Sequence, residues 1–307
     1  MIVTRIDGGL GNQMFQYAYG LYLATKHQTE LALDLSSFRT GPQHGYMLDR
    51  FQITGTPLRA DQAQWLPHRY RDSAVELKTS WLRNRLSDWL NPSVLHRVKE
   101  RPFGFDRKYL AARDQSYLVG YWQSEKFFPG LRGELLKQFV PVSMISEPSQ
   151  RIIERMQSTA SIALHIRRGD YISNPATADL YEQLSIDYYR SSLERFAAQH
   201  REVQVFVFSN DLAWCRKHLE LPFPTHFVDH TRQSTAYEDL VMMSHAMCNV
   251  IANSTFSWWA AYLNHRPDRM TFAPERWFRP GTLDGTHLPC PAWQLVSATA
   301  PQLARAA

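Results

Sequence analysis

Two consecutive arginines follow an apolar segment that has the length and composition of a buried strand. The segment is residues 161–166, and Arg167, Arg168, Gly169 and Asp170 come directly after it. Adjacent guanidinium groups repel one another, so they favour a position beside an anion. A diphosphate is a natural partner because each guanidinium can bind phosphate oxygens through two N–H groups, which a lysine cannot match. The alternative is a surface ion pair between Arg168 and Asp170.

Polar residues also follow a later strand, expected at residues 249–252. They are Asn253, Ser254 and Thr255, followed by Phe256 in the first turn of an expected helix. Backbone N–H groups and small hydroxyls at the start of a helix bind anions, although helix capping alone explains one such residue. Three consecutive polar residues exceed what one cap requires, so we predict that this turn lines a ligand site.

Glycines near the N-terminus indicate a further loop that can approach a phosphate. Gly9 and Gly11 follow the first expected strand with the spacing of a dinucleotide-binding loop, and Asp34 ends the second strand where a ribose-binding acid would lie. The third glycine of that pattern is replaced by Met14, which weakens a nicotinamide interpretation. The backbone can still approach a phosphate, with side-chain hydrogen bonds from two following residues, Asn12 and Gln13.

No metal or cofactor is indicated by the pattern of acidic residues, histidines and cysteines. The sequence contains no Asp-x-Asp, and no His, Cys or Asp cluster has metal-ligand spacing. If the ligand is a nucleotide sugar, arginines and amides must neutralise its diphosphate. We therefore predict a metal-independent activity without a cofactor.

These residues lie at the ends of regularly alternating strands and helices. In the second half we expect strands at residues 161–166, 203–208, 226–228, 249–252 and 270–273, and helices at residues 187–200, 211–219, 235–247 and 255–263. Such alternation predicts a doubly wound parallel sheet, which binds ligands beyond the carboxyl ends of its strands. Near the N-terminus, residues 2–6, 12–24 and 31–35 predict a strand, a helix and a strand, and residues 36–141 give no clear topology. A proline- and serine-containing break near residue 145 divides the chain into domains 1–145 and 146–307.

The composition is that of an ordinary globular protein, with 44% hydrophobic and 21% charged residues. The formal net charge of +5 comes without a dense basic block, so we expect no nucleic-acid partner but leave a peripheral membrane contact open. No segment is apolar enough to span a membrane, and the amphipathic stretch 74–90 predicts a core helix. Three scattered cysteines predict no disulfide frame and favour the cytoplasm, with the inner membrane face left open.

Three segments together resemble the bacterial alpha-1,2-fucosyltransferases of glycosyltransferase family 11. They are residues 8–16 (GGLGNQMFQ), 165–171 (HIRRGDY) and 253–259 (NSTFSWW). The resemblance extends in the expected order over nearly the whole chain. It implies an α/β fold of the GT-B type, in which two Rossmann-like domains face each other across a cleft. The N-terminal domain would offer the acceptor, and the C-terminal domain would bind GDP-fucose.

The resemblance also implies roles for individual residues. Arg167 and Arg168 would hold the diphosphate, and His165 would lie beside the nucleotide. Other donor contacts would come from Ser254, Thr255 and Phe256, with Asp239 as a candidate for binding guanine. The product would be an alpha-linked fucose on the 2-hydroxyl of a galactose-terminated or lipid-linked glycan. Arg168, Asp170 and His165 are the candidate catalytic residues; the general base is left open among Asp170, His165 and Asp7.

Three rival functions remain open at this point. One is a fucosyltransferase that forms another linkage, since the residues that choose the acceptor are not identified. The second is an NAD-dependent oxidoreductase, which depends on Gly9, Gly11 and Asp34. The third is a glycan or sugar-nucleotide binding module, which would bind GDP without turnover.

Overall fold

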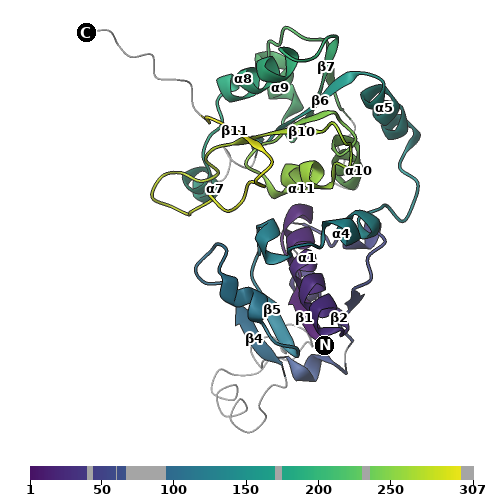
Figure 1. Cartoon of the computed structure of the whole chain (residues 1–307), viewed down its shortest axis with the longest axis vertical. Helices are drawn as coiled ribbons and strands as arrows, with labels where there is room; N and C mark the ends of the chain where they lie inside the picture. The colour runs from purple at the N-terminus through teal and green to yellow at the C-terminus, as the bar shows by residue number, and fades with distance from the viewer. Residues whose placement is uncertain (40–43, 60, 67–94, 170–174, 230–235, 299–307) are drawn as a thin grey trace. The chain divides into compact units, whose positions relative to one another are not determined.

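The chain folds into two compact units, Met1–Val142 and Ser143–Ala307. The computed structural model describes residues 1–39, 44–59, 61–66, 95–169, 175–229 and 236–298 (Figure 1). The segment 74–90 and Asp170 lie outside the described residues. Each unit contains a parallel sheet with helices, which confirms the expected α/β class.

The N-terminal unit has a five-stranded sheet of order β3-β2-β1-β5-β4 with parallel pairings throughout. Its strands are β1 (Ile2–Arg5), β2 (Leu31–Asp34), β3 (Thr56–Pro57), β4 (His96–Lys99) and β5 (Ser116–Val119). The described α-helices are α1 (Leu10–His27) and α4 (Arg132–Gln138). Short 3-10 helices are η1 (Ser36–Phe38), η2 (Leu48–Arg50), η3 (Ala63–Trp65), η4 (Arg107–Ala111) and η5 (Glu125–Phe127).

Helix α1 packs directly on β1 and β2. It extends beyond the predicted residues 12–24, because Gly9 caps it in an extended conformation and Gln28 ends it with a left-handed φ of 52°. A Cβ atom on Gly20 would lie 2.9 Å from Cδ1 of Leu31 and 3.1 Å from Cγ2 of Thr4. The missing side chain at Gly20 therefore allows the helix to approach the sheet closely.

The C-terminal unit has a six-stranded parallel sheet of order β11-β10-β9-β6-β7-β8. The strands are β6 (Ala160–Ile166), β7 (Val203–Ser209), β8 (Thr225–Phe227), β9 (Cys248–Val250), β10 (Met270–Pro274) and β11 (Gln294–Val296). The described helices are α5 (Glu147–Gln157), α7 (Pro175–Leu180), α8 (Ile186–Ala197), α9 (Leu212–His218), α10 (Ala236–Met243) and α11 (Thr255–Leu263). All five strands and four helices predicted for this half are present. The prediction missed α5, α7 and β11, and it extended α10 too far, because a turn leads from Met243 into β9.

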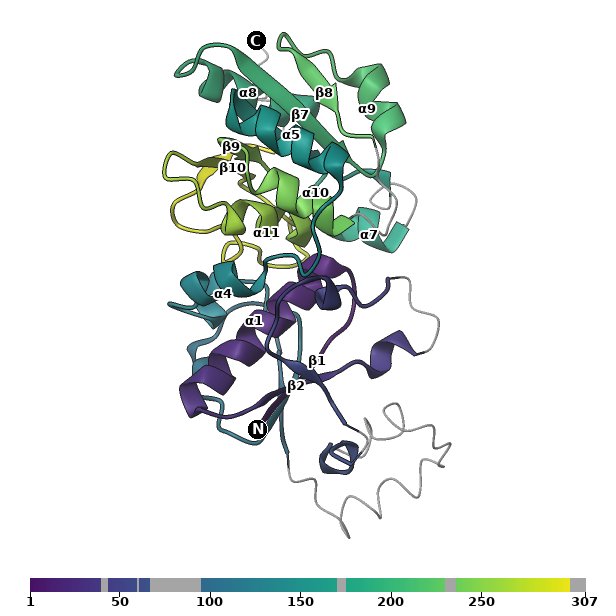
Figure 2. The same cartoon turned by 90° about the vertical axis from the view of Figure 1, so that its right-hand side faces the viewer.

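Strand β6 lies in the middle of this sheet and has different surroundings on its two faces. Ile162, Leu164 and Ile166 are buried in an apolar core with residues of α8 and α9. Alternation along the strand turns Ala163 and His165 to the opposite face, where Figure 2 shows α5, α10 and α11 grouped together. The side chain of His165 therefore faces the helix that follows β9.

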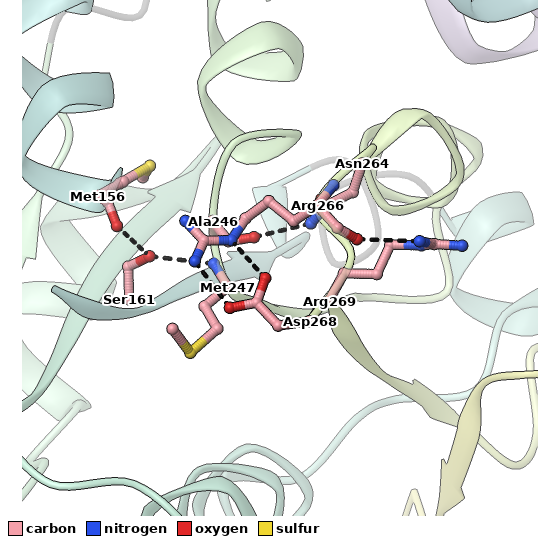
Figure 3. A network of polar contacts seen from close by, with 8 residues as sticks. All are labelled: Met156, Ser161, Ala246, Met247, Asn264, Arg266, Asp268 and Arg269. Carbon is pink, nitrogen blue, oxygen red and sulfur yellow. Dashed lines mark hydrogen bonds and ion pairs between the residues drawn. The ribbon is translucent and has the colours of Figure 1, made fainter. Parts of the chain in front are cut away.

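The amino ends of the C-terminal strands are closed by buried polar bonds (Figure 3). The Ser161 hydroxyl donates to the carbonyl of Met156 at 2.7 Å and accepts the N–H of Met247 at 3.1 Å. The Asn264 amide donates to the carbonyl of Ala246 at 2.8 Å. These bonds pair buried polar groups of the loops at the amino ends of the strands and so stabilise this end of the sheet.

Candidate functional site

The loop after β6 is held by the residue that follows β7. The two strands pair in parallel with Ile166 opposite Ser209, so their carboxyl ends lie side by side. The side-chain oxygen of Asn210 accepts the backbone N–H of Arg168 at 3.0 Å and that of Gly169 at 3.2 Å. A Cβ atom on Gly169 would lie 3.1 Å from Nδ2 of Asn210, which is a tight contact. Asn210 therefore fixes the course of the arginine loop.

The guanidinium of Arg168 lies over an aromatic ring. Its central carbon is 4.1 Å from the centroid of Trp214, a distance at which a cation is attracted to the ring face. Its Nε atom is 4.0 Å from Oδ2 of Asp211, which is too long for a hydrogen bond. The side chain of Arg168 is 36% exposed. Trp214 therefore positions the Arg168 side chain from one side. Because Asp211 is too far away to accept a hydrogen bond, it leaves the N–H groups of Arg168 available to an anion.

Asp211 has a structural role of its own. Its carboxylate accepts the backbone N–H of Trp214 at 3.0 Å and so caps α9, as an Asp at an N-cap position commonly does. The same bond fixes the first turn of α9, which carries the indole beneath Arg168. The ion pair considered for Arg168 in the sequence was with Asp170, which lies outside the described residues; the observed neighbour is Asp211.

His165 and Phe256 form a ring contact at the same sheet edge. Their centroids are 5.6 Å apart, and His165 is 5% exposed. Strand β6 pairs with β9, so the loop from β9 into α11 meets the carboxyl end of β6. The structure therefore brings His165 next to the predicted donor residues of α11.

The start of α11 is not capped by a side chain. Ser254 is the N-cap residue, yet its hydroxyl makes no capping hydrogen bond to the helix. Thr255 and Phe256 in the first turn are partly exposed. Helix capping therefore does not explain why Ser254 is polar. This leaves ligand binding as the explanation for the polar turn.

Asn253 has a different position from its neighbours. It is 1% exposed, and its amide N–H groups donate to the carbonyls of Glu182 at 2.7 Å and Trp277 at 2.9 Å. These bonds tie the β9–α11 loop to two other loops of the unit. The arrangement indicates that Asn253 positions the loop.

Asp239 is a buried acid in the first turn of α10. Burial raises the pKa of its carboxyl to about 7, with a contribution from the negative charge of Glu238. Glu238 itself accepts hydrogen bonds from the hydroxyls of Ser146 and Ser149, both at 2.6 Å. Asp239 can therefore change its charge near neutral pH when a ligand approaches.

The glycine loop predicted for donor binding lies in the N-terminal unit. Gly9 and Gly11 begin α1, and the side chain of Asn12 accepts a hydrogen bond from Gln123 at 2.8 Å. The buried Gln13 donates to the carbonyls of Gly8 at 2.8 Å and Gly45 at 2.9 Å, and its oxygen accepts the N–H of Met47 at 3.0 Å. This amide therefore supports the surrounding loops.

The acid proposed for an NAD ribose is also engaged inside the protein. Asp34 is 1% exposed, and its carboxylate accepts the hydroxyl of Tyr117 at 2.6 Å and the N–H of Ser36 at 3.0 Å. A buried carboxylate with these partners does not offer itself to a ribose. This geometry argues against the oxidoreductase interpretation.

Sequence reasoning missed Asn210 and Trp214 as parts of this site. Neither residue is among the site residues predicted from the sequence. The signal that could have found Asn210 is its position directly after the strand next to β6. Trp214 lies one helical turn further on, where its ring can reach the arginine loop.

The described residues contain neither a metal-binding cluster nor a helix that could span a membrane. No group of three or more His, Cys, Asp or Glu side chains is arranged to hold a metal ion among them. Within the same residues, no helix combines the length and apolar character needed to cross a bilayer.

The fold is that of a GT-B glycosyltransferase. A crystal structure of POFUT1 in complex with GDP-fucose matches it with a TM-score of 0.54, covering 89% of this chain and 97% of that chain at 14% identity. Residues 1–279 match the family described as Glycosyl transferase family 11, so the chain belongs to that family and is a glycosyltransferase. The fold and the family match confirm the GT-B fold and the membership of glycosyltransferase family 11 that the sequence predicts.

Two relatives extend the comparison. The alpha-1,2-colitosyltransferase of Escherichia coli is 30% identical over 95% of this chain and 97% of its own length. The galactoside 2-alpha-L-fucosyltransferase Sec1 of Mus musculus is 27% identical, over 86% of this chain and 64% of its own length.

Proposed function

We propose that this glycosyltransferase moves L-fucose from GDP-beta-L-fucose to the 2-hydroxyl of a galactose-terminated glycan, with inversion and without a metal ion. Family membership supports the reaction class. The names of both relatives specify a linkage to a 2-position, and that of the mouse enzyme specifies a galactoside. We further propose that the C-terminal unit binds the donor and the N-terminal unit the acceptor. Three buried cysteines that are scattered along the chain favour a cytoplasmic location.

The observation that carries this proposal is the geometry of Arg168. Its guanidinium lies 4.1 Å from the ring of Trp214, and within the described residues the ion-pair partner, Asp211, is 4.0 Å away, too far to accept a hydrogen bond. Negative charge grows on the departing GDP as the bond to fucose breaks. A positive group that is already in place stabilises this charge without reorganisation. We assign Arg168 to that role, with Arg167 as a second diphosphate ligand.

The surrounding residues fit the rest of the donor. The ring pair of His165 and Phe256 offers an apolar surface beside the phosphates. The Ser254 hydroxyl and the N–H groups of the first turn of α11 can bind phosphate oxygens. An ionised Asp239 can accept the two N–H groups on the edge of guanine, so nucleotide binding should favour its charged form.

A general base is still to be assigned. The acceptor hydroxyl must lose its proton, but a weak base suffices when the leaving group departs ahead of attack. His165, Asp170 and Asp7 are the candidates. Asp7 is held by Gln16, whose amide accepts the Asp7 N–H at 2.9 Å and donates to its carboxylate at 3.1 Å. A pH–rate profile of each single variant distinguishes them, because only loss of the base removes the acidic limb.

The proposal is tested by measuring GDP release from GDP-fucose in the presence of EDTA, with and without a panel of beta-galactosides. Release that requires a galactoside supports a metal-independent transferase, and the product linkage follows from NMR of the glycan. GDP binding without release would instead favour a binding module. An enzyme that bound NAD and not GDP would restore the oxidoreductase interpretation.

A second donor sugar is favoured by one observation. The relative that is 30% identical is a colitosyltransferase, and colitose is fucose without its 3-hydroxyl. A site that hydrogen-bonds this hydroxyl would discriminate strongly against colitose, whereas an apolar site would not. The ratio of kcat/KM for the two GDP-sugars, measured with one acceptor, decides between them.

A further inference from the structure

Basic side chains line a cavity beside β4. Strand β4 is the edge strand of the N-terminal sheet (Figure 1). The cavity has a volume of about 410 Å³ and is formed by β4 and residues 108–113. None of its nine lining residues is acidic, and five are basic: His96, Arg97, Lys99, Lys108 and Arg113. Such a lining creates a positive potential that attracts anions.

The acidic residues closest in the sequence bind to groups other than Arg97 and Arg113. Asp106 pairs with Lys108 at 2.7 Å, and Asp114 pairs with the terminal ammonium of Met1 at 2.6 Å. The carboxylate of Glu100 accepts two backbone N–H groups after β5, at 2.7 and 3.0 Å. Among these three acids, Asp106 therefore neutralises a charge at the cavity, that of Lys108.

Arg97 and Arg113 carry two of the positive charges at this cavity. Both side chains are exposed, and in the described part of the chain no carboxylate lies within 4.0 Å of either guanidinium. A guanidinium binds phosphate oxygens through two parallel N–H groups. Two of them on one cavity provide N–H groups for several oxygens of one phosphate.

The wall opposite β4 is held in place by hydrogen bonds. The ammonium of Lys26 donates to the carbonyl of Leu110 at 2.6 Å, and the ring of His27 lies 2.8 Å from the carbonyl of Ala112. The hydroxyl of Tyr109 donates to the carbonyl of Lys99 at 3.2 Å and so ties this wall to β4. The cavity is therefore preformed, and a ligand would not have to order it.

We propose that this cavity binds a phosphate group, with Arg97 and Arg113 as its principal ligands. The phosphate could belong to an anionic phospholipid of a membrane or to a soluble phosphate ester or diphosphate. In the first case the site would dock the N-terminal unit on a lipid surface. Phosphate binding at this cavity depends on charge and local geometry alone and is a property separate from the proposed sugar transfer.

The test compares the full-length enzyme with the double variant Arg97→Gln/Arg113→Gln. The matched control is Arg195→Gln/Arg201→Gln, which removes the same charge from two exposed arginines of the C-terminal unit. Binding is measured by flotation with phosphatidylcholine vesicles that do or do not contain phosphatidylglycerol. A parallel titration with pyrophosphate contains saturating GDP, so that the proposed donor site is already filled. Thermal unfolding checks that both variants fold.

Flotation that requires phosphatidylglycerol, and is roughly thirty-fold weaker only in the Arg97/Arg113 variant, supports the phospholipid source. Pyrophosphate binding that this variant alone loses, without flotation, supports a soluble phosphate. The proposal is overturned if the wild type binds neither probe, or if both double variants lose binding equally. Because neither readout uses catalysis, failure here is separable from failure of the proposed transfer reaction.

Discussion

Removal of the Arg168 guanidinium should abolish most of the transferase activity while sparing the fold. In Arg168→Ala the proposed diphosphate loses a positive charge that is already in place, and the expected loss is about 3 kcal/mol of transition-state stabilisation. This corresponds to a fall of roughly a hundred-fold in kcat/KM. The stability cost should stay below about 1 kcal/mol, because the ion pair that Arg168 makes within the described residues, with Asp211, is long at 4.0 Å and the side chain is 36% exposed.

Two further variants separate charge from position. Arg168→Lys keeps a positive charge but loses the flat group that stacks on the indole, so we expect an intermediate activity. Trp214→Leu removes the stack and keeps the arginine. It should cost about 0.5–1 kcal/mol, or a two- to five-fold loss of kcat/KM, as for a partly exposed cation–π contact.

The assay is the initial rate of acceptor-dependent GDP release, with GDP affinity from calorimetry and Arg195→Ala as an exposed control on the same unit. A kcat/KM near the wild-type value in Arg168→Ala would refute the diphosphate assignment. An equal loss in Arg195→Ala would show that net charge, and not position, is responsible.

Three further predictions concern residues that position the loops and tune their charge. Asn210→Ala removes the acceptor of two backbone N–H groups at Arg168 and Gly169, so turnover should fall about ten-fold, with a stability loss of roughly 1–2 kcal/mol in urea unfolding. GDP affinity should fall as the pH is lowered through about 7, because protonation removes the Asp239 acceptor, and Asp239→Asn should flatten this dependence in calorimetry. Gln13→Ala should lower the free energy of unfolding by about 1–3 kcal/mol, because three backbone groups lose their partner, and should leave GDP affinity unchanged.

Each of these has a result that contradicts it. Wild-type turnover in Asn210→Ala would mean that the loop keeps its course without the amide. A GDP affinity that stays constant between pH 6 and 8, taken as roughly one unit either side of the shifted pKa, would remove Asp239 from the guanine site. A stable Gln13→Ala protein that no longer binds GDP would support the donor-binding role first predicted for Gln13.

The sequence was sufficient to predict the C-terminal sheet and the edge at which the candidate site lies. Apolar segments of three to six residues alternate there with helical patterns, and a parallel sheet presents the residues after its strands at one edge. Arg168 and Phe256 were found in this way, and the structure places them after β6 and β9. His165 was predicted from the family resemblance and lies at the carboxyl end of β6, in contact with Phe256. The middle of the N-terminal half resisted prediction, because β3 to β5 are only two to four residues long and are held by their neighbours in the sheet.

Only the tertiary structure decided what each polar residue does. Ser254 and Asn253 look equivalent in the sequence, yet the hydroxyl of one makes no cap and the amide of the other is bonded to two distant carbonyls. Likewise Gln13 carries the groups of a ligand-binding residue but supports loops that are 5 to 34 positions away in the chain. The support of Arg168 comes from Asn210 and Trp214, more than forty residues further on. Residue type and spacing show which groups are available, but their bonds depend on which distant segments the fold places beside them.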